Sequence, residues 1–250
     1  MKISIITIVF NGETTITRAI ESVLSQKNVE IEYIVIDGAS QDKTIQVINP
    51  YQKQLTYFIS EKDGGIYDAM NKGIKLATGE VVGILNADDF YTNSLVLSDV
   101  MAQFMDPLVD AVYGDLEYFR ASRPDKVVRT YRSDNFRPAQ LKKGVMPAHP
   151  TLFLRKKVYE KFGIFDTSYK IAGDFEFVVR IFKDDSLNAR YLKQKMVKMQ
   201  MGGVSTRGLS SFIILLNENI RACHKNGIST NYYHLLSRYP RKLLEFFFIN

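Results

Sequence analysis

Residues 61–91 read EKDGGIYDAMNKGIKLATGEVVGILNADDFY, and this stretch decides the fold. Residues 65–77 carry apolar side chains at helical spacing, so we predict a helix that Gly79 ends. Residues 80–89 contain a short apolar run, which is typical of a strand buried in a sheet. The strand ends in NADD (86–89), where two adjacent carboxylates repel each other and indicate that a cation lies nearby.

The same alternation of strand and helix fills the chain before residue 61. Because the turns between these elements are short, the pattern predicts βαβ units and a mostly parallel sheet, an α/β fold. Ligands of such sheets bind beyond the carboxyl ends of the strands. The predicted strands are 3–10, 31–38 and 55–61, and the predicted helices are 14–26 and 40–51.

Polar residues stand at three of the predicted strand ends. Phe10 is followed by Asn11, the second strand ends in Asp37 before a turn, and the fourth ends in 86–89. Since the carboxyl ends of parallel strands meet at one edge of a sheet, we expect these three ends to form one crevice.

After about residue 106 the pattern becomes irregular. Two further strands are expected to form an antiparallel pair, and a last strand leads into a Gly-Gly loop that we interpret as a hinge. Short helices follow to the end of the sequence. The predicted elements are strands 110–119 and 125–131, a strand-to-helix passage in 148–163, a helix at 173–184, the last strand within 186–206, and helices 208–226 and 230–248.

Composition limits the class of protein. The chain has 250 residues, enough for a well-buried core, and a net charge of +6. Its single cysteine, Cys223, excludes an internal disulfide and fits a reducing compartment. With no signal peptide and no membrane-spanning run expected, we predict a cytoplasmic protein. No zinc-ligand pattern or long basic block indicates nucleic-acid binding.

The sequence from Thr206 onward is basic. With six basic and two acidic residues it holds +4 of the net +6. The run RKLLEFFF (241–248) adds apolar side chains, which predicts a surface that meets anionic lipid on the inner face of the cytoplasmic membrane. A helix docked on the domain, with its phenylalanines in the core, is equally compatible. The basic residues are Arg207, Arg221, Lys225, Arg238, Arg241 and Lys242.

Asp88 and Asp89 are candidate metal ligands. Adjacent carboxylates after an amide suit a hard divalent cation held by one or two protein oxygens and by phosphate oxygens. Alternatively, Asp89 caps the helix expected after it, an explanation that fits Asp88 less well.

Three further polar residues each allow two interpretations. Asp37 stands where a ribose or base contact is expected, or else it organises an Asx-turn. Asp174 precedes a helix, either as its cap or as a general base that faces the crevice. His149 is either a core histidine or a contact to phosphate, metal or acceptor.

Together these motifs resemble the family 2 glycosyltransferases, which use nucleotide-sugar donors and have the GT-A fold. The resemblance covers nearly all of residues 1–205, and its form is similar to the bacterial polysaccharide-assembly branch. It is carried by five ordered stretches: ISIITIVFNGETTITRAIESVLSQ, EYIVIDGASQDKT, EKDGGIYDAMNKGIKLATGEVVGILNADD, HPTLF and YKIAGDFEFVVRI.

The resemblance implies a role for each matching position. Asp174 matches the catalytic base of an inverting transfer, and Asp88 matches the acid that binds Mn²⁺ or Mg²⁺ on the donor diphosphate, with Asp89 a second candidate. The donor-binding residues implied are Thr7, Phe10, Asp37, Asp68, Asn71, Lys72, Asn86 and Asp88, and His149 is the implied acceptor or phosphate contact. The implied division has three parts: 1–105 binds a UDP or GDP sugar, 106–205 binds a glycan or polyprenyl-linked acceptor, and 206–250 is a helical extension that is a candidate membrane-facing segment.

The sequence departs from the family pattern in two places. Asn86 replaces the first acid of the DXD motif, and Gly173-Asp174 leaves one carboxylate where a pair is usual. No Q-x-x-R-W motif follows, which argues against a processive synthase and for transfer of one sugar per binding event. A non-catalytic member that only binds nucleotide sugars stays open because of Asn86. A sugar nucleotidyltransferase fits less well, since no Gly-rich basic loop follows the first strand.

Overall fold

The computed structural model describes residues 1–202 and 208–237, and its strands form one nine-stranded sheet. The strand order is β3-β2-β1-β4-β8-β6-β9-β5, and β7 pairs with β6 outside this path. The strands of the N-terminal half run parallel, as the strand-helix alternation predicts. They are β1 (Lys2–Val9), β2 (Glu30–Asp37), β3 (Tyr57–Ser60) and β4 (Val81–Asn86).

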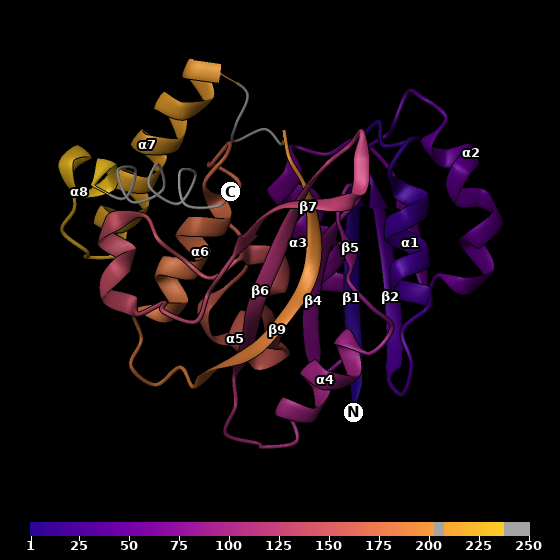
Figure 1. The fold of residues 1–250 in the computed structure, drawn as a ribbon, viewed down its shortest axis with the longest axis horizontal. Helices are drawn as coiled ribbons and strands as arrows, with labels where there is room; N and C mark the ends of the chain where they lie inside the picture. The colour runs from indigo at the N-terminus through magenta and orange to yellow at the C-terminus, as the bar shows by residue number, and fades with distance from the viewer. Residues whose placement is uncertain (203–207, 238–250) are drawn as a thin grey trace.

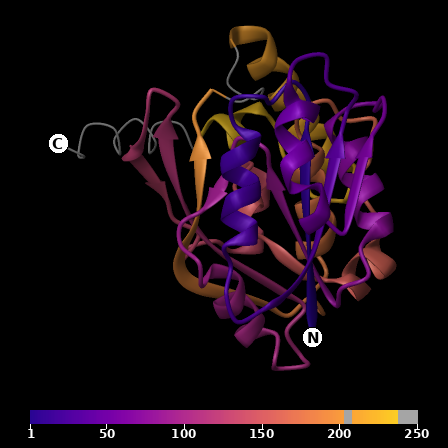
Figure 2. The same cartoon turned by 90° about the vertical axis from the view of Figure 1, so that its right-hand side faces the viewer.

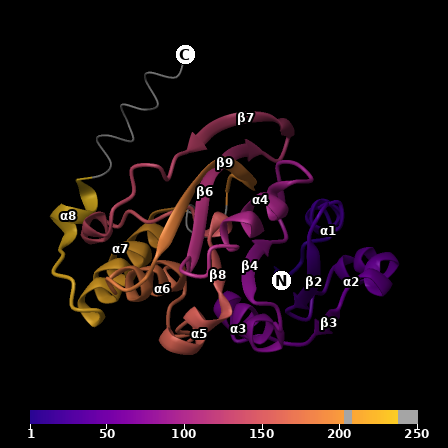
Figure 3. The same ribbon diagram turned by 90° about the horizontal axis from the view of Figure 1, so that it is seen from below.

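Helices cover both faces of this parallel half (Figures 1 and 3). Successive residues of a strand point to opposite faces, so Ile5 packs in the cluster that includes α1, and Ile6 packs in the cluster that includes α3. A Cβ on Gly73 of α3 would stand 2.3 Å from Ile6 Cγ2, so this glycine lets the helix approach β1 closely. The helices of this half are α1 (Ile16–Leu24), α2 (Thr44–Ile48), α3 (Ile66–Leu76) and α4 (Val96–Gln103), with a 3₁₀ helix, η1 (Asn49–Gln54).

The C-terminal half continues the same sheet with mixed pairing. β6 and β7 pair antiparallel, as predicted, whereas β9 runs parallel to β6 and antiparallel to β5. Figure 2 shows β7 at the edge of the molecule, away from the parallel half. The elements are β5 (Phe90–Tyr91), β6 (Ala111–Arg120), β7 (Arg123–Tyr131), β8 (Phe153–Arg155), β9 (Ala189–Gln200), α5 (Lys156–Phe162), α6 (Gly173–Phe182), η2 (Pro138–Lys143) and η3 (His149–Thr151).

The basic extension begins with a docked helix. α7 (Gly208–Lys225) lies beside α6 and buries Leu216, Ala222 and Cys223, and the short α8 (Tyr232–Leu236) follows (Figure 1). The run 241–248 and the predicted hinge residue Gly203 lie outside the described residues. No helix in the described part of the chain is long and apolar enough to cross a membrane.

Candidate active site

The register of the parallel strands brings the three polar strand ends together. Val9 of β1 pairs with Asp37 of β2, and Ile8 pairs with Asn86 of β4. The ends of β2 and β4 therefore flank the end of β1 at one edge of the sheet. Phe10 follows β1 at this edge, and 63% of the residue is exposed.

Asp37 is buried and organises the turn after β2. Its carboxylate accepts hydrogen bonds from the Ser40 N–H (3.1 Å), the Ser40 hydroxyl (2.5 Å) and the Ser60 hydroxyl (2.6 Å). Thr7 is also buried, and its hydroxyl lies 3.1 Å from that of Tyr33. Asp37 therefore has the turn-forming role that was one of its two interpretations, and Thr7 connects β1 to β2 through Tyr33.

The start of α3 is acidic around one lysine. The ammonium of Lys72 lies 2.8 Å from Glu61, 2.5 Å from Asp63 and 3.8 Å from Asp68. Hydrogen bonds from Lys72 to Asp63 and Glu61 raise the pKa of the lysine. One positive charge faces three negative ones, so an anionic ligand at this point needs a further cation.

Asn71 points away from this acidic cluster. Its side-chain amide donates to the Phe165 carbonyl (2.9 Å) and accepts the Phe165 N–H (2.9 Å), and the residue is buried. Both polar atoms of the amide are therefore engaged with the backbone of a segment 94 residues away. A donor contact by Asn71 requires this pair to open.

Asp89 is fully enclosed at the end of β4. Its carboxylate accepts the Gln200 N–H (3.3 Å) and an Asn86 amide hydrogen (3.4 Å). Burial and the neighbouring Asp88 charge raise the pKa of Asp89 well above its usual range. The interpretation of Asp89 as a helix cap is wrong, because β5 follows it directly and α4 begins only at Val96.

A protein cation does approach this acidic strand end, from α1. The guanidinium of Arg18 lies against the rings of Phe90 and Phe119, 4.5 and 4.7 Å from their centroids. Burial lowers the pKa of Arg18, and the charges of Asp89 and Asp88 act in the opposite direction. The sequence analysis missed Arg18, although it is the one basic residue of the amphipathic helix α1.

The oxygens at the end of β4 fit a divalent cation that is shared with a ligand. The Asn86 side-chain oxygen is buried and accepts no hydrogen bond, and Asp88, two residues on, is half-buried. Across residues 1–202 and 208–237, no group of three or more His, Cys, Asp or Glu could enclose a metal. An amide and a carboxylate alone leave most positions of a Mg²⁺ or Mn²⁺ ion to water and phosphate oxygens.

Asp174 lies in the first turn of α6 rather than at its cap, which is Ala172. One oxygen, Oδ1, accepts the Phe175 N–H (2.8 Å) and lies 3.3 Å from the Tyr67 hydroxyl, which also donates to the Ile171 carbonyl (2.5 Å). Burial, and then the Asp174 charge, raise the pKa of Tyr67. Tyr67 thus links α3 to the carboxylate, a contact that the sequence analysis did not foresee.

His149 interacts with this carboxylate, and Glu176 follows it by two residues in α6. His149 is half-buried, with its ring 5.8 Å from that of Phe165; burial lowers the pKa of His149, and the charge of Asp174 opposes this. Glu176 is fully buried and lies 2.7 Å from Arg180 and 3.6 Å from Lys225. Glu176 therefore has a structural role, whereas the pKa of His149 responds to the charge of Asp174.

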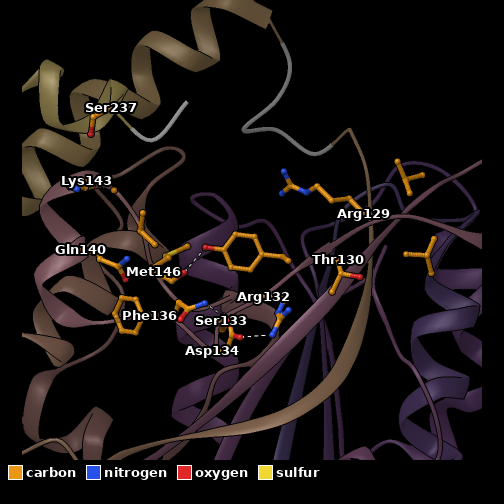
Figure 4. A pocket seen from close by; sticks show the side chains of 16 residues that line it. Arg129, Thr130, Arg132, Ser133, Asp134, Phe136, Gln140, Lys143, Met146 and Ser237 are labelled. Atoms are coloured by element: carbon orange, nitrogen blue, oxygen red, sulfur yellow. Dashed lines mark hydrogen bonds and ion pairs between the residues drawn. The ribbon is translucent and has the colours of Figure 1, made fainter. Parts of the chain in front are cut away.

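A separate cavity of about 720 Å³ lies on the C-terminal half, between β7 and the η2 region (Figure 4). Arg129 and Arg132 line it from the β7 side, Lys143 and Met146 face them, and Ser237 lies at its rim. None of the donor-site, metal or base residues predicted from the sequence lines this cavity.

Residues 4–163 match the sequence model of Glycosyl transferase family 2. The chain belongs to this family. An uncharacterized glycosyltransferase of Mycobacterium tuberculosis, MT1564, is 33% identical over 184 residues, 71% of this chain and 68% of that protein. A PGL/p-HBAD biosynthesis glycosyltransferase of Mycobacterium bovis is 27% identical over 215 residues, 81% of this chain and 78% of the relative.

Solved structures show the fold of this family 2 glycosyltransferase. TarS 1–349 of S. aureus in complex with UDP-GlcNAc superposes with a TM-score of 0.70 at 20% identity, over 89% of this chain and 66% of that one. The mannosyltransferase PcManGT of Pyrobaculum calidifontis, in complex with GDP-Man and Mn²⁺, superposes with a TM-score of 0.64 at 19% identity. The match covers 89% of this chain and 63% of that one. The GT-A fold predicted from the sequence is thereby confirmed.

Proposed function

We propose that this family 2 glycosyltransferase moves one sugar, with inversion, from a nucleotide-diphosphate donor to a glycan or lipid-linked acceptor in surface polysaccharide synthesis. The observation that carries the proposal is the placement of Asp174. Its Oδ1 is held by Phe175 and Tyr67, whereas Oδ2 accepts no hydrogen bond from the described residues. A carboxylate fixed through one oxygen, with the other oxygen available, is the arrangement that a general base requires.

In the proposed reaction Asp174 Oδ2 accepts the proton of the acceptor hydroxyl as the hydroxyl oxygen attacks the anomeric carbon. The bond between that carbon and the diphosphate oxygen breaks, and the electron pair leaves with the diphosphate. Tyr67 keeps Asp174 oriented and, with its raised pKa, stays protonated as a donor. His149, with its lowered pKa, is neutral at pH 7 and is available as a hydrogen-bonding contact to acceptor or phosphate.

The donor is proposed to bind at the strand-end edge. Phe10 is positioned to stack on the base, with Thr7 and Asp37 behind it shaping the base and ribose pocket, and Asp68 and Lys72 lie at the start of α3. A bound Mn²⁺ or Mg²⁺ would supply positive charge against the developing charge of the leaving diphosphate. Asp88 and the unpartnered Asn86 oxygen would hold it. The acidic surroundings of Lys72 support a need for that cation.

The carrier part of the acceptor is proposed to occupy the cavity beside β7. Arg129 and Lys143 provide positive charge, Arg132 is paired with Asp134 at 2.6 Å, and Met146 provides apolar surface, all in one hollow (Figure 4). That combination suits an anionic group attached to a lipid better than a neutral glycan. Binding of a short-chain prenyl phosphate to wild type, and its loss in Arg129→Ala with Lys143→Ala, tests the assignment; equal binding by the variant refutes it.

Binding and turnover together test the whole proposal. We expect UDP or GDP to bind more tightly with Mn²⁺ than with chelator by calorimetry, and a matching nucleotide sugar to be hydrolysed or transferred. Binding without any turnover supports the non-catalytic alternative that Asn86 left open. Release of pyrophosphate from a nucleoside triphosphate identifies a nucleotidyltransferase instead.

A further inference from the structure

The side chain of Glu218 reaches from α7 into the loop that precedes α6. Its carboxylate accepts the backbone N–H groups of Lys170 (2.7 Å), Ile171 (2.9 Å) and Ala172 (2.8 Å). The residue is buried, with 9% of its surface exposed. A buried carboxylate is costly unless it is hydrogen-bonded, so three donors on one side chain indicate a built contact rather than an incidental one.

This contact caps α6 from another helix. Ala172 is the N-cap residue of α6, and its own side chain provides no acceptor. Glu218 supplies the acceptor and also places a negative charge near the N-terminus of the helix, where the helix dipole favours it. The start of α6, which carries Asp174, is therefore fixed by a residue 44 positions later in the sequence.

Ile171 and Tyr67 connect the Glu218 contact to Asp174. The N–H of Ile171 is held by Glu218, and the carbonyl of Ile171 accepts the hydroxyl of Tyr67 at 2.5 Å. The same hydroxyl lies 3.3 Å from Asp174 Oδ1. A shift of Ile171 would move the Tyr67 hydroxyl and with it the orientation of the Asp174 carboxylate.

One face of α7 holds the rest of this loop. Arg221 places its guanidinium 4.3 Å from the ring centroid of Tyr169 and donates to the Ser168 hydroxyl at 2.5 Å. Lys225 pairs with Asp166 at 2.7 Å. Because Glu218, Arg221 and Lys225 are spaced three and four residues apart, they lie on one face of the helix. The loop 166–172 is thus bound along its length by α7.

We propose that Glu218 is a positioning residue for the general base: it holds the loop 166–172 so that Asp174 Oδ2 faces the acceptor. The inference rests on the proposed function, because it assigns Glu218 its effect through Asp174. It gives one buried side chain of α7, in the C-terminal extension, an effect on the catalytic base. Glu218 was not among the site residues predicted from the sequence.

The test is Glu218→Gln in the full chain. A glutamine keeps the shape but turns an N–H₂ group toward backbone N–H donors, so at least one hydrogen bond is lost. A misplacement of about 1 Å at a reacting group costs about 100-fold in rate, and we expect kcat for donor hydrolysis and transfer to fall by that order while donor Kd stays within about twofold. Asn217→Ala is the control: Asn217 is exposed on the same helix, bonds Tyr232 of α8, and should leave kcat unchanged.

A double-mutant cycle separates positioning from general support of the fold. In an Asp174→Asn background Glu218→Gln should lower kcat by no more than about twofold, because the group it positions is already absent. An equal loss in both backgrounds, or a loss of donor affinity with kcat preserved, overturns the inference. The four proteins of the cycle are assayed well below the melting temperature of the least stable one.

Hydrogen exchange of the wild-type protein gives a readout that needs no variant and no acceptor. The amides of residues 170–172 should exchange as slowly as those in the middle of α7, and unprotected exchange contradicts the inference. The two proposals fail differently. Full activity of Asp174→Asn refutes the base assignment itself, whereas full activity of Glu218→Gln beside an inactive Asp174→Asn refutes only the role of Glu218.

Discussion

Replacement of Asp174 by Asn removes the proposed base while leaving its contacts nearly intact. The amide oxygen of Asn can still accept the Phe175 N–H and the Tyr67 hydroxyl, the two partners of Oδ1. The position of Oδ2 becomes an N–H₂ group, which cannot take a proton. The chemical capacity of the residue is therefore lost with little change in geometry.

The expected magnitudes differ sharply between turnover and stability. General-base catalysis contributes roughly 100- to 10,000-fold, which corresponds to about 3–5 kcal/mol in the barrier for transfer. Loss of a half-buried charge in the first turn of a helix costs only about 0.3–1 kcal/mol of folding free energy. Donor affinity should stay near that of wild type, because Asp174 acts on the acceptor.

The assay pairs calorimetry of the donor with the rate of nucleotide diphosphate release, and a melting curve reports stability. Asp185→Asn is the matched control, since Asp185 is exposed just beyond the other end of α6 and undergoes the same chemical change. We expect full activity for the control. If Asp174→Asn binds donor poorly but turns over at the wild-type rate, Asp174 supports the fold and the base is another residue, with His149 the next candidate.

Three other perturbations probe the cation, the fold and the extension. Asp88→Asn should weaken Mn²⁺ and donor binding together by calorimetry, and unchanged affinity for both would falsify the metal assignment. Burial by itself raises the pKa of Glu32, but hydrogen bonds from Ser4 and Thr78 lower it to about 2. Glu32→Gln should therefore cost about 2–3 kcal/mol at pH 7 in urea unfolding, and the difference from wild type should vanish as the pH falls from about 4.5 through 2; a pH-independent difference contradicts this reasoning. Deletion of 230–250 should abolish flotation with anionic vesicles, since each basic residue near such a surface is worth about 1 kcal/mol; flotation of the truncated chain, or none by the intact one, excludes the tail as a membrane contact.

Local periodicity determined the parallel half of the fold. The apolar runs at 3–10, 31–38 and 80–86 are strands because each must be buried on both faces, and the helices between them return the chain to the same edge. The placement of Asp37 and Asn86 beside the end of β1 followed from that topology alone. The strand-end site could therefore be predicted from the sequence.

The tertiary structure alone decided which partner each polar side chain has. Arg18 approaches Asp88 and Asp89 only because α1 packs against β5, which directly follows these carboxylates, and Asn71 bonds Phe165 across 94 positions. Tyr67 and Asp174 are 107 residues apart, and the sequence around either residue does not indicate that the two are in contact. Periodicity indicates which face of an element is buried, but it does not indicate which distant residue contacts that face. Pairing of buried charges and amides is fixed by the packing of whole elements, and the sequence of a single element does not contain that information.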